Sequence, residues 1–281
     1  MGMVLQRSYF HIDAVHTDKY ISMFLPTDTW AQVLYIFILS SLRYIIIAGL
    51  AFALFYGLFR NRSLFVKIQK KWPTGRDYRR EMGYSFLTFI FFAATPLVLN
   101  NHYIKPYTTI YRNIHQHSML YFWLVFPIML IVHDAYFYWM HRMMHHPRLF
   151  AFFHVVHHKS TNPSPWASFS FQPTEAIIES GIIYVFAFTF PVHFIHLFSF
   201  LIFMTAYNVY GHLGFELFPA GFNRHWFFKW FNTSVNHNMH HQYFKENYGL
   251  YFTWWDRMMN TLNKNYDTRF GEVTDEIQMH W

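Results

Sequence analysis

The sequence predicts an all-α integral membrane protein with about four transmembrane helices, one pair of them a hairpin, and a cytoplasmic helical cap. Three observations support this fold class. Only 13% of the 281 residues are charged, about half the share found in soluble domains. Aromatic residues make up 23% of the chain, and Tyr and Trp are typical of membrane interfaces. Several apolar stretches also reach the roughly 20 residues that a helix needs to cross the hydrocarbon layer.

The apolar stretches give the membrane helices in chain order. They are residues 31–59, 84–100, 119–138 and 176–210. The last stretch is longer than one span needs and is broken at Pro191, so it predicts a helical hairpin. The first 29 residues lack the short apolar core and cleavage site of a signal peptide, so we expect none there.

The connection between the first two spans is strongly basic and predicts the orientation. Residues 60–80 contain one acid, Asp77, and eight basic residues: Arg60, Arg62, Lys67, Lys70, Lys71, Arg76, Arg79 and Arg80. Because positively charged loops remain in the cytoplasm, we expect this loop to be cytoplasmic. Counting crossings then places 101–118 outside and returns the ends of the third span and the hairpin to the cytoplasmic side. The net charge of +7 fits an anionic lipid surface and not nucleic acid, because no basic stripe marks a soluble domain.

Three histidine clusters are the strongest functional signal in the chain. They contain His141 and His145; His154, His157 and His158; and His237, His240 and His241. On a helix, positions i, i+3 and i+4 share one face, so each cluster would aim its rings in one direction. Imidazole is a common ligand for divalent first-row metals. The repeated spacing therefore predicts a polyhistidine metal centre at the cytoplasmic face.

Four further residues are expected to complete this centre. His212 follows the hairpin on the same side and is a candidate ligand, and Asn208 lies one turn before it as a weak ligand or a supporting group. Asp134 and Tyr138 share a helical face with His141. A carboxylate at Asp134 could accept the second N–H of a ligating histidine, and it would be expensive in an apolar span without such a partner.

The donor types restrict the metal. The chain has no Cys, which excludes Fe–S clusters and thiolate haem and argues against a structural zinc site. Magnesium and calcium prefer oxygen donors. So many imidazoles could hold two ions of intermediate softness with positions left for O2, and iron fits that arrangement. Zinc or another divalent metal stays open at this point.

The histidine clusters and their flanking residues resemble a known family. His141-Arg-Met-Met-His145-His146, His154-Val-Val-His157-His158 and His237-Asn-Met-His240-His241 are similar to the histidine boxes of the fatty acid hydroxylase / sterol desaturase superfamily. Asn247-Tyr-Gly followed by Trp-Asp256-Arg resembles the segment after its last box. The stretch from Pro163 to Ser168, with Pro173 and Glu175, is most similar to sterol C-5 desaturases. Asn238 and Asn260 depart from that pattern, where Thr and Gly are usual.

The resemblance implies a membrane-bound non-haem diiron oxidoreductase. Such an enzyme uses O2 and two electrons, from a ferredoxin or a cytochrome-b type donor with its reductase, to desaturate or hydroxylate a lipid. It implies a sterol-like substrate first, with a fatty acid or sphingolipid hydroxylase as the alternative. By position, the metal ligands would be His141, His145, His154, His157, His158, His212, His237, His240 and His241. All but His212 are also expected to be catalytic. Residues 119–281 would form the catalytic domain and 1–118 an N-terminal membrane region.

Several alternatives remain open at this level. A His-rich metal-ion transporter would also combine spans with histidines, but its ligands should lie near mid-span. A membrane haem protein needs only pairs of axial histidines. The sequence leaves open whether His133 or His146 is an additional ligand. It also does not separate the endoplasmic reticulum from a bacterial inner membrane.

Overall fold

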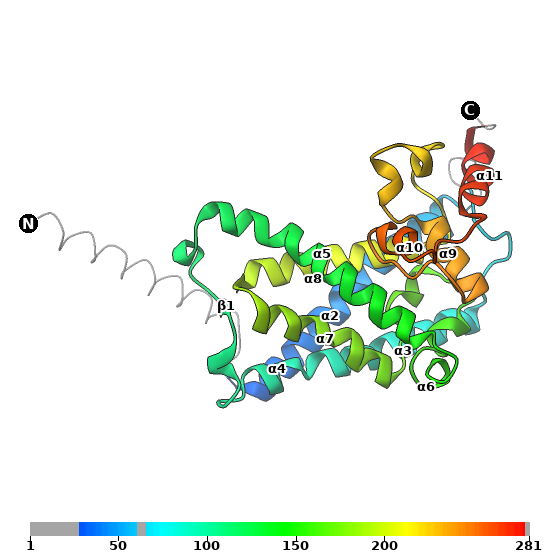
Figure 1. Cartoon of the computed structure of the whole chain (residues 1–281). Coiled ribbons are helices and arrows are strands. Elements are labelled where there is room, and N and C mark those ends of the chain that lie inside the picture. Colours follow the sequence, from blue (N-terminus) through cyan, green and yellow to red (C-terminus); the bar gives the residue numbers. More distant parts are fainter. Residues whose placement is uncertain (1–27, 61–65, 279–281) are drawn as a thin grey trace, which may run out of the picture.

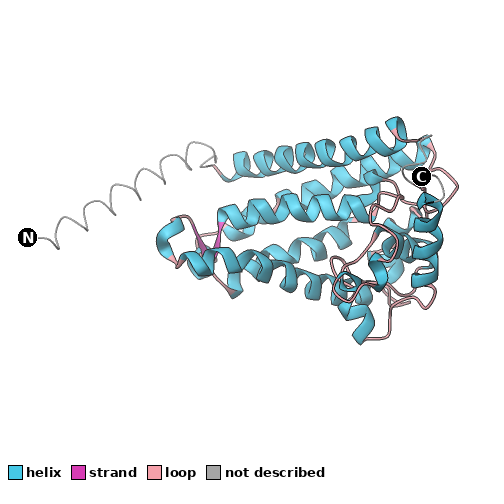
Figure 2. Cartoon of the chain, turned by 90° about the horizontal axis from the view of Figure 1, so that it is seen from above, coloured by secondary structure: helices cyan, strands magenta, loops and turns pink. Residues whose placement is uncertain are grey.

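The computed structural model describes residues 28–60 and 66–278. Most of the segment used for the signal-peptide expectation and one basic residue, Arg62, lie outside the described residues. Figures 1 and 2 show long helices running side by side, with a cap of short helices and loops gathered at one end of the bundle.

Two long helices form the N-terminal part of the bundle. α2 (Thr29–Phe52) begins at the Asp28 cap, whose side chain accepts a hydrogen bond from the Ala31 amide, and continues as the π-helix η1 (Ala53–Leu58). α3 (Gly75–Ala93) is followed by the short α4 (Thr95–Leu99). A capping box between Thr74 and Asp77 starts α3. The second span therefore begins earlier than residue 84, and the end of the basic stretch is helical.

The third span and the hairpin complete the bundle. α5 (Met119–Met144) continues past the predicted end at residue 138 and carries His141, the first histidine of the three clusters. α7 (Pro173–Thr189) and α8 (Phe194–Gly211) form the hairpin, and the chain breaks between them at Pro191 as predicted. Two short strands join the far ends of the bundle: β1 (Ile110–Tyr111) pairs in parallel with β2 (Val192–His193).

Four helical segments of the described chain are long and apolar enough to cross a membrane: Thr29–Leu58, Gly75–Leu99, Met119–Met144 and Phe194–Gly211. α7 pairs with the last of them. Leucine and isoleucine side chains on the outer faces of these helices are exposed, as expected for surfaces that face lipid. The prediction of an all-α membrane protein is confirmed.

The cap consists of short elements that follow the spans. They are α6 (Phe150–Phe153), the 3-10 helices η4 (His157–Lys159), η5 (Pro165–Phe169), η6 (Phe222–Arg224) and η7 (Phe228–Trp230), and the helices α9 (Ser234–Tyr243), α10 (Trp254–Met258) and α11 (Tyr266–Gln278). Two further 3-10 turns, η2 (Lys105–Tyr107) and η3 (Ile114–Gln116), lie in the connection at the opposite end.

The N-terminal helices pack directly on the histidine-bearing half of the chain. Tyr44 on α2 is fully buried, and its hydroxyl donates to the Trp166 carbonyl in η5 at 2.7 Å. Arg43 donates to Thr205 on α8 at 2.9 Å, which gives this charged group a polar partner inside an apolar span. The predicted division at residue 118 stays a prediction, because nothing in these contacts separates the two parts.

A paired histidine centre

The first histidine cluster is placed by α5. Asp134, Tyr138 and His141 are all buried on one side of this helix, and His145 is its C-terminal cap residue. The spacing of four, three and four residues therefore aligns these side chains as predicted.

The second cluster does not lie on an α-helix, so the helical interpretation of its spacing is wrong. His154 ends the single turn of α6, and His157 and His158 begin the 3-10 helix η4. The four helical residues of α6 are too few to hold three ligand positions on one face. All three rings are nevertheless buried.

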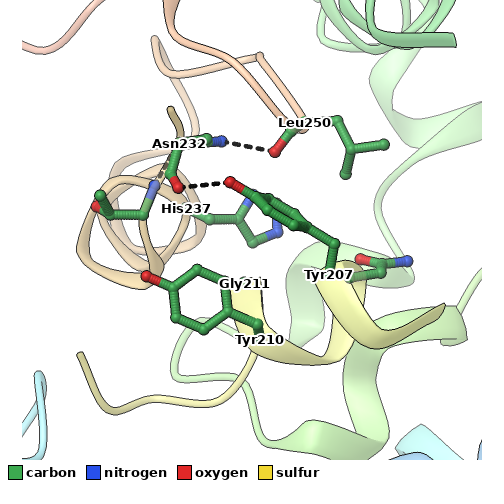
Figure 3. Close-up of a pocket in the computed structure, with 8 residues that line it drawn as sticks. Tyr207, Tyr210, Gly211, Asn232, His237 and Leu250 are labelled. Atoms are coloured by element: carbon green, nitrogen blue, oxygen red, sulfur yellow. Dashed lines mark hydrogen bonds between the residues drawn. The ribbon is translucent and has the colours of Figure 1, made fainter. Parts of the chain in front are cut away.

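The third cluster does lie on an α-helix. His237, His240 and His241 are buried on α9, which starts at the Thr233 cap, whose hydroxyl accepts from the Asn236 amide at 3.2 Å. His212 caps the end of α8 next to it. Gly211 lies against the His237 ring, since a Cβ there would be in van der Waals contact with it at 3.4 Å. Figure 3 shows His237 and Gly211 beside the small pocket between α8 and α9.

The nine rings form two sets. The five-histidine set contains His141, His145, His154, His158 and His240, and the four-histidine set contains His157, His212, His237 and His241. Within each set, one nitrogen per ring lies within 4.8 Å of all the others. In both His-x-x-His-His clusters the two adjacent histidines go to different sets.

Hydrogen bonds at the outer nitrogens fix several ring tautomers. The Nδ1 atoms of His141, His212, His240 and His241 lie 2.7–2.9 Å from the backbone carbonyls of Tyr248, Asn208, Glu246 and Ser160, respectively. His154 Nδ1 lies 2.6 Å from Glu175 Oε1. A carbonyl or carboxylate oxygen can only accept, so each Nδ1 carries the proton and each Nε2 presents a lone pair.

These lone pairs point at one another inside both sets. His141 Nε2 is 3.0 Å from His154 Nε2, and His212 Nε2 is 3.1 Å from His241 Nε2. Two neutral acceptors cannot hydrogen-bond, so each arrangement needs a cation between its rings. Two ligands about 2.1 Å from one ion and at right angles to each other are about 3.0 Å apart. The donor set therefore fits one metal ion in each set.

Burial keeps the rings neutral, as metal ligands must be. Burial lowers the pKa of His212 to about 4 and that of His145 to about 2, with neighbouring His141 lowering the latter further. The same desolvation holds the pKa far below the usual range for His154, His157, His158, His237, His240 and His241.

An unusual turn after α9 supplies two of the orienting carbonyls. Phe244, Glu246 and Asn247 all have positive φ, at 67°, 85° and 58°, which is costly for residues with a side chain. The turn presents the Glu246 carbonyl to His240 and continues to Tyr248, whose carbonyl reaches His141. Backbone strain is thus stored beside the histidine rings.

The segment from Asn247 to Arg257, which we call the tail, holds this turn in place. Asp256 accepts from the amides of Tyr248 and Gly249 at 2.9 and 2.8 Å, and burial raises the pKa of its carboxyl to about 6. A Cβ at Gly249 would lie 2.4 Å from the Phe252 carbonyl oxygen, so only glycine fits. Asn260 has φ of 52°, a conformation that Asn tolerates better than most residues, which explains its presence where glycine is usual.

The prediction that Asp134 accepts a hydrogen bond from a histidine is wrong. Asp134 instead accepts from the amides of Tyr251 and Phe252 and from the Trp254 indole, at 2.7–3.1 Å. The tail folds back against α5 and satisfies this carboxylate, while His141 uses the Tyr248 carbonyl. Asp134 therefore supports the tail and reaches the rings only through it.

Tyr138 and Asn208 also differ in detail from the expectation. The Tyr138 hydroxyl pairs with the Thr261 hydroxyl and accepts from Arg142, so it contacts no histidine nitrogen. Asn208 does support His212, but through its backbone carbonyl. Its side-chain amide donates to the Ser168 carbonyl, which turns it away from a ligand role.

Two buried glutamates were missed as supporting groups. Glu175, noted only as part of the resemblance, provides the carboxylate–histidine contact expected of Asp134. Glu81 on α3 accepts from the hydroxyls of Ser160, at 2.7 Å, and Ser164. The Ser160 carbonyl in turn orients His241. Both glutamates adjoin apolar stretches, where burying a carboxylate without a partner costs free energy. Their positions in the sequence could therefore have marked them as groups that need a polar partner.

The two undecided histidines lie outside both sets. His133 Nδ1 lies 2.9 Å from the Tyr251 hydroxyl inside the bundle. His146 is exposed, and its Nδ1 accepts from the Arg148 amide.

Comparison with known proteins agrees with this geometry. Residues 126–261 match the fatty acid hydroxylase family model. The chain is 30% identical to a Delta(7)-sterol 5(6)-desaturase of Gibberella zeae over 54% of its length and 46% of the relative's. It is 28% identical to a Delta(7)-sterol 5(6)-desaturase of Leptosphaeria maculans, over 97% and 74% of the two chains. Human lathosterol oxidase is 27% identical over 85% and 73%.

The first of these alignments spans less than half of the relative's length. No solved structure matches the chain. The matched region contains all nine histidines of the two sets, and the second alignment runs through nearly the whole chain. The chain is therefore similar to the fatty acid hydroxylase family over residues 126–261 and to sterol desaturases over more of its length.

Proposed function

We propose that this protein is a membrane-bound non-haem diiron oxidoreductase that desaturates or hydroxylates a lipid, with a sterol-like lipid as the first candidate. The observation that carries the proposal is the pairing of five and four imidazoles, all but one of them buried, with lone pairs that point at one another within each set. The named relatives supply the reaction class, and Delta(7)-sterol 5(6)-desaturation is what their names describe.

Within this proposal, all nine histidines bind metal and hold the centre at the cap end of the bundle. When bound, the metal pair supplies O2 activation and the oxidation of an unactivated C–H bond, with two electrons from a ferredoxin or a cytochrome-b type donor and its reductase. The protein positions the target carbon and excludes water. Burial of every ring in both sets except half-buried His145 supports the second role.

We further propose that the centre faces the cytoplasm, in the endoplasmic reticulum or a bacterial inner membrane. Lys70 and Lys71 lie beside Met239 of α9, and Arg80 near the start of α3 donates to Ser160, so these basic residues are at the cap end. The positive-inside rule assigns that end to the cytoplasm. A cytoplasmic centre would also be accessible to a soluble electron donor.

Lipid profiling by mass spectrometry tests the activity. Cells that express the protein should contain a lipid that has lost two hydrogens or gained one oxygen relative to cells without it. His157→Ala and His240→Ala, one from each set, should abolish the product while the protein is still present in the membrane. Near-normal product from either variant would refute its ligand role. A sterol product would favour desaturation of the relatives' kind, and a hydroxylated acyl chain or sphingoid base would favour the alternative substrate class.

A further inference from the structure

One part of the cap exposes large apolar side chains although it belongs to none of the candidate spans. We call residues 222–231 the aromatic loop; it contains η6 and η7 and lies between α8 and α9. Trp226 is 75% exposed, and Phe227, Phe228 and Trp230 are also exposed. A surface facing only water would not normally carry such a contiguous apolar group.

The loop combines these aromatic residues with positive charge. Between Leu217 and Lys245 the chain has three Lys or Arg residues and no Asp or Glu, and two of the three, Arg224 and Lys229, lie in the aromatic loop. The Lys229 ammonium lies 4.9 Å from the centre of the Trp230 ring. Trp and Phe alternating with Lys and Arg is the composition of segments that lie in the headgroup layer of a membrane with anionic lipids.

Contacts with the rest of the cap hold both ends of the aromatic loop in place. Phe222 stacks on Phe218 with ring centres 3.8 Å apart and on Phe228 at 5.0 Å. At the other end, the Thr253 amide donates to the Trp230 carbonyl at 2.8 Å. These contacts hold the base of the loop in place, while Trp226 and Phe227 are exposed.

The loop is also in the right place to meet the bilayer. Figure 1 shows it, in gold, standing out to the side of the long helices at their cap end, and α11 extends further along the bundle. The sides of those helices carry the exposed apolar residues that face lipid. If these helices cross the membrane, a segment beside them at the cap end would lie near the membrane surface.

We propose that the aromatic loop inserts Trp226 and Phe227 into the headgroup layer of the membrane that the bundle spans, with Arg224 and Lys229 on anionic headgroups. The loop joins the segment that carries His212 to the segment that carries His237. Its attachment would therefore set the height of the four-histidine set above the hydrocarbon layer. This proposal goes beyond the proposed function and does not require lipid oxidation.

The absence of cysteine from the chain allows a direct test with single labels. Trp226→Cys and a control, Lys264→Cys, on an exposed position near the start of α11, are each labelled with the fluorophore NBD. The full chain is placed in nanodiscs of phosphatidylcholine and phosphatidylglycerol that contain lipids with a doxyl quencher near the headgroup. We expect blue-shifted emission and several-fold stronger quenching at position 226 than at 264.

Three results would overturn the proposal. One is equal, weak quenching at both positions, which means that the loop faces water. Another is a blue shift at 226 without quenching, which means that the loop contacts a second protein molecule. The third is quenching at 226 that survives unchanged in Arg224→Gln/Lys229→Gln with phosphatidylglycerol removed, which refutes the role of the two basic residues. Phe227→Cys gives an independent label if Trp226→Cys does not fold.

Discussion

The five-histidine and four-histidine sets are equally buried in nearly all their rings but are supported in different ways. The five-histidine set has a carboxylate directly on one ring, Glu175 on His154, and carbonyls from the strained turn after α9. The four-histidine set has only carbonyls on its rings, and its carboxylate, Glu81, acts through Ser160. These supports of the first set all come from residues 175–248, and the second set depends in part on Glu81 of α3, far earlier in the chain.

The largest expected effect comes from removing one ligand of each set. His145→Ala and His212→Ala should each abolish lipid oxidation, because each leaves a ligand position empty in a different set. The sharper measurement is metal content, in which each variant should lose the ion of its own set first. Full metal content in both variants, at normal activity, would contradict the division into sets.

Acidification should empty both sets together. In the folded protein burial lowers the pKa of eight rings outside the spans, while the unfolded chain has the ordinary value of about 6.5. The unfolded state therefore binds more protons below that value, so stability is present above pH ~6.5 and falls as the pH decreases through it. Melting temperature and metal content of the detergent-solubilised protein should drop steeply between pH ~6.5 and 5. A flat profile in that range would contradict neutral ligands.

Glu175→Gln should cost less than a lost ligand. The variant keeps the shape but loses the charge behind His154, and such substitutions lower metal affinity or activity by about 10- to 100-fold. Glu179→Gln is the matched control, one turn further along α7 and without a hydrogen bond to a histidine among the described residues. Equal losses in both variants would show that membrane packing, not support of His154, explains the effect.

Glu81→Gln should have the smallest effect, below about 10-fold, because Glu81 acts through the Ser160 backbone. The effect should appear as weaker metal binding in the four-histidine set, with the exposed Arg79→Gln on the same helix as control. Combining Glu81→Gln with Ser160→Ala should be non-additive. If the losses of metal binding in the two single variants add fully in the double variant, Glu81 does not act on His241 through Ser160.

The sequence predicted which histidines form the centre better than it predicted how they are arranged. Histidine spacing identified eight of the nine rings, the position after the hairpin added His212, and apolar length identified the bundle, because all three can be read from the local sequence. The division into two sets could not be predicted, since adjacent pairs such as His157 and His158 diverge, and that depends on how η4 turns. The rule that a buried acid needs a partner correctly marked Asp134, but its partner depended on the fold of the tail.

Because adjacent histidines belong to different sets, a movement of the backbone that carries them would change the geometry of both sets. His240 and His241 stand on the same turn of α9, yet they belong to different histidine sets. Any tilt of that turn that relaxes one position must distort the other. Vacancy at one position is therefore transmitted to its neighbour, and the pair should fill as a cooperative unit, with singly loaded protein scarce at every metal concentration.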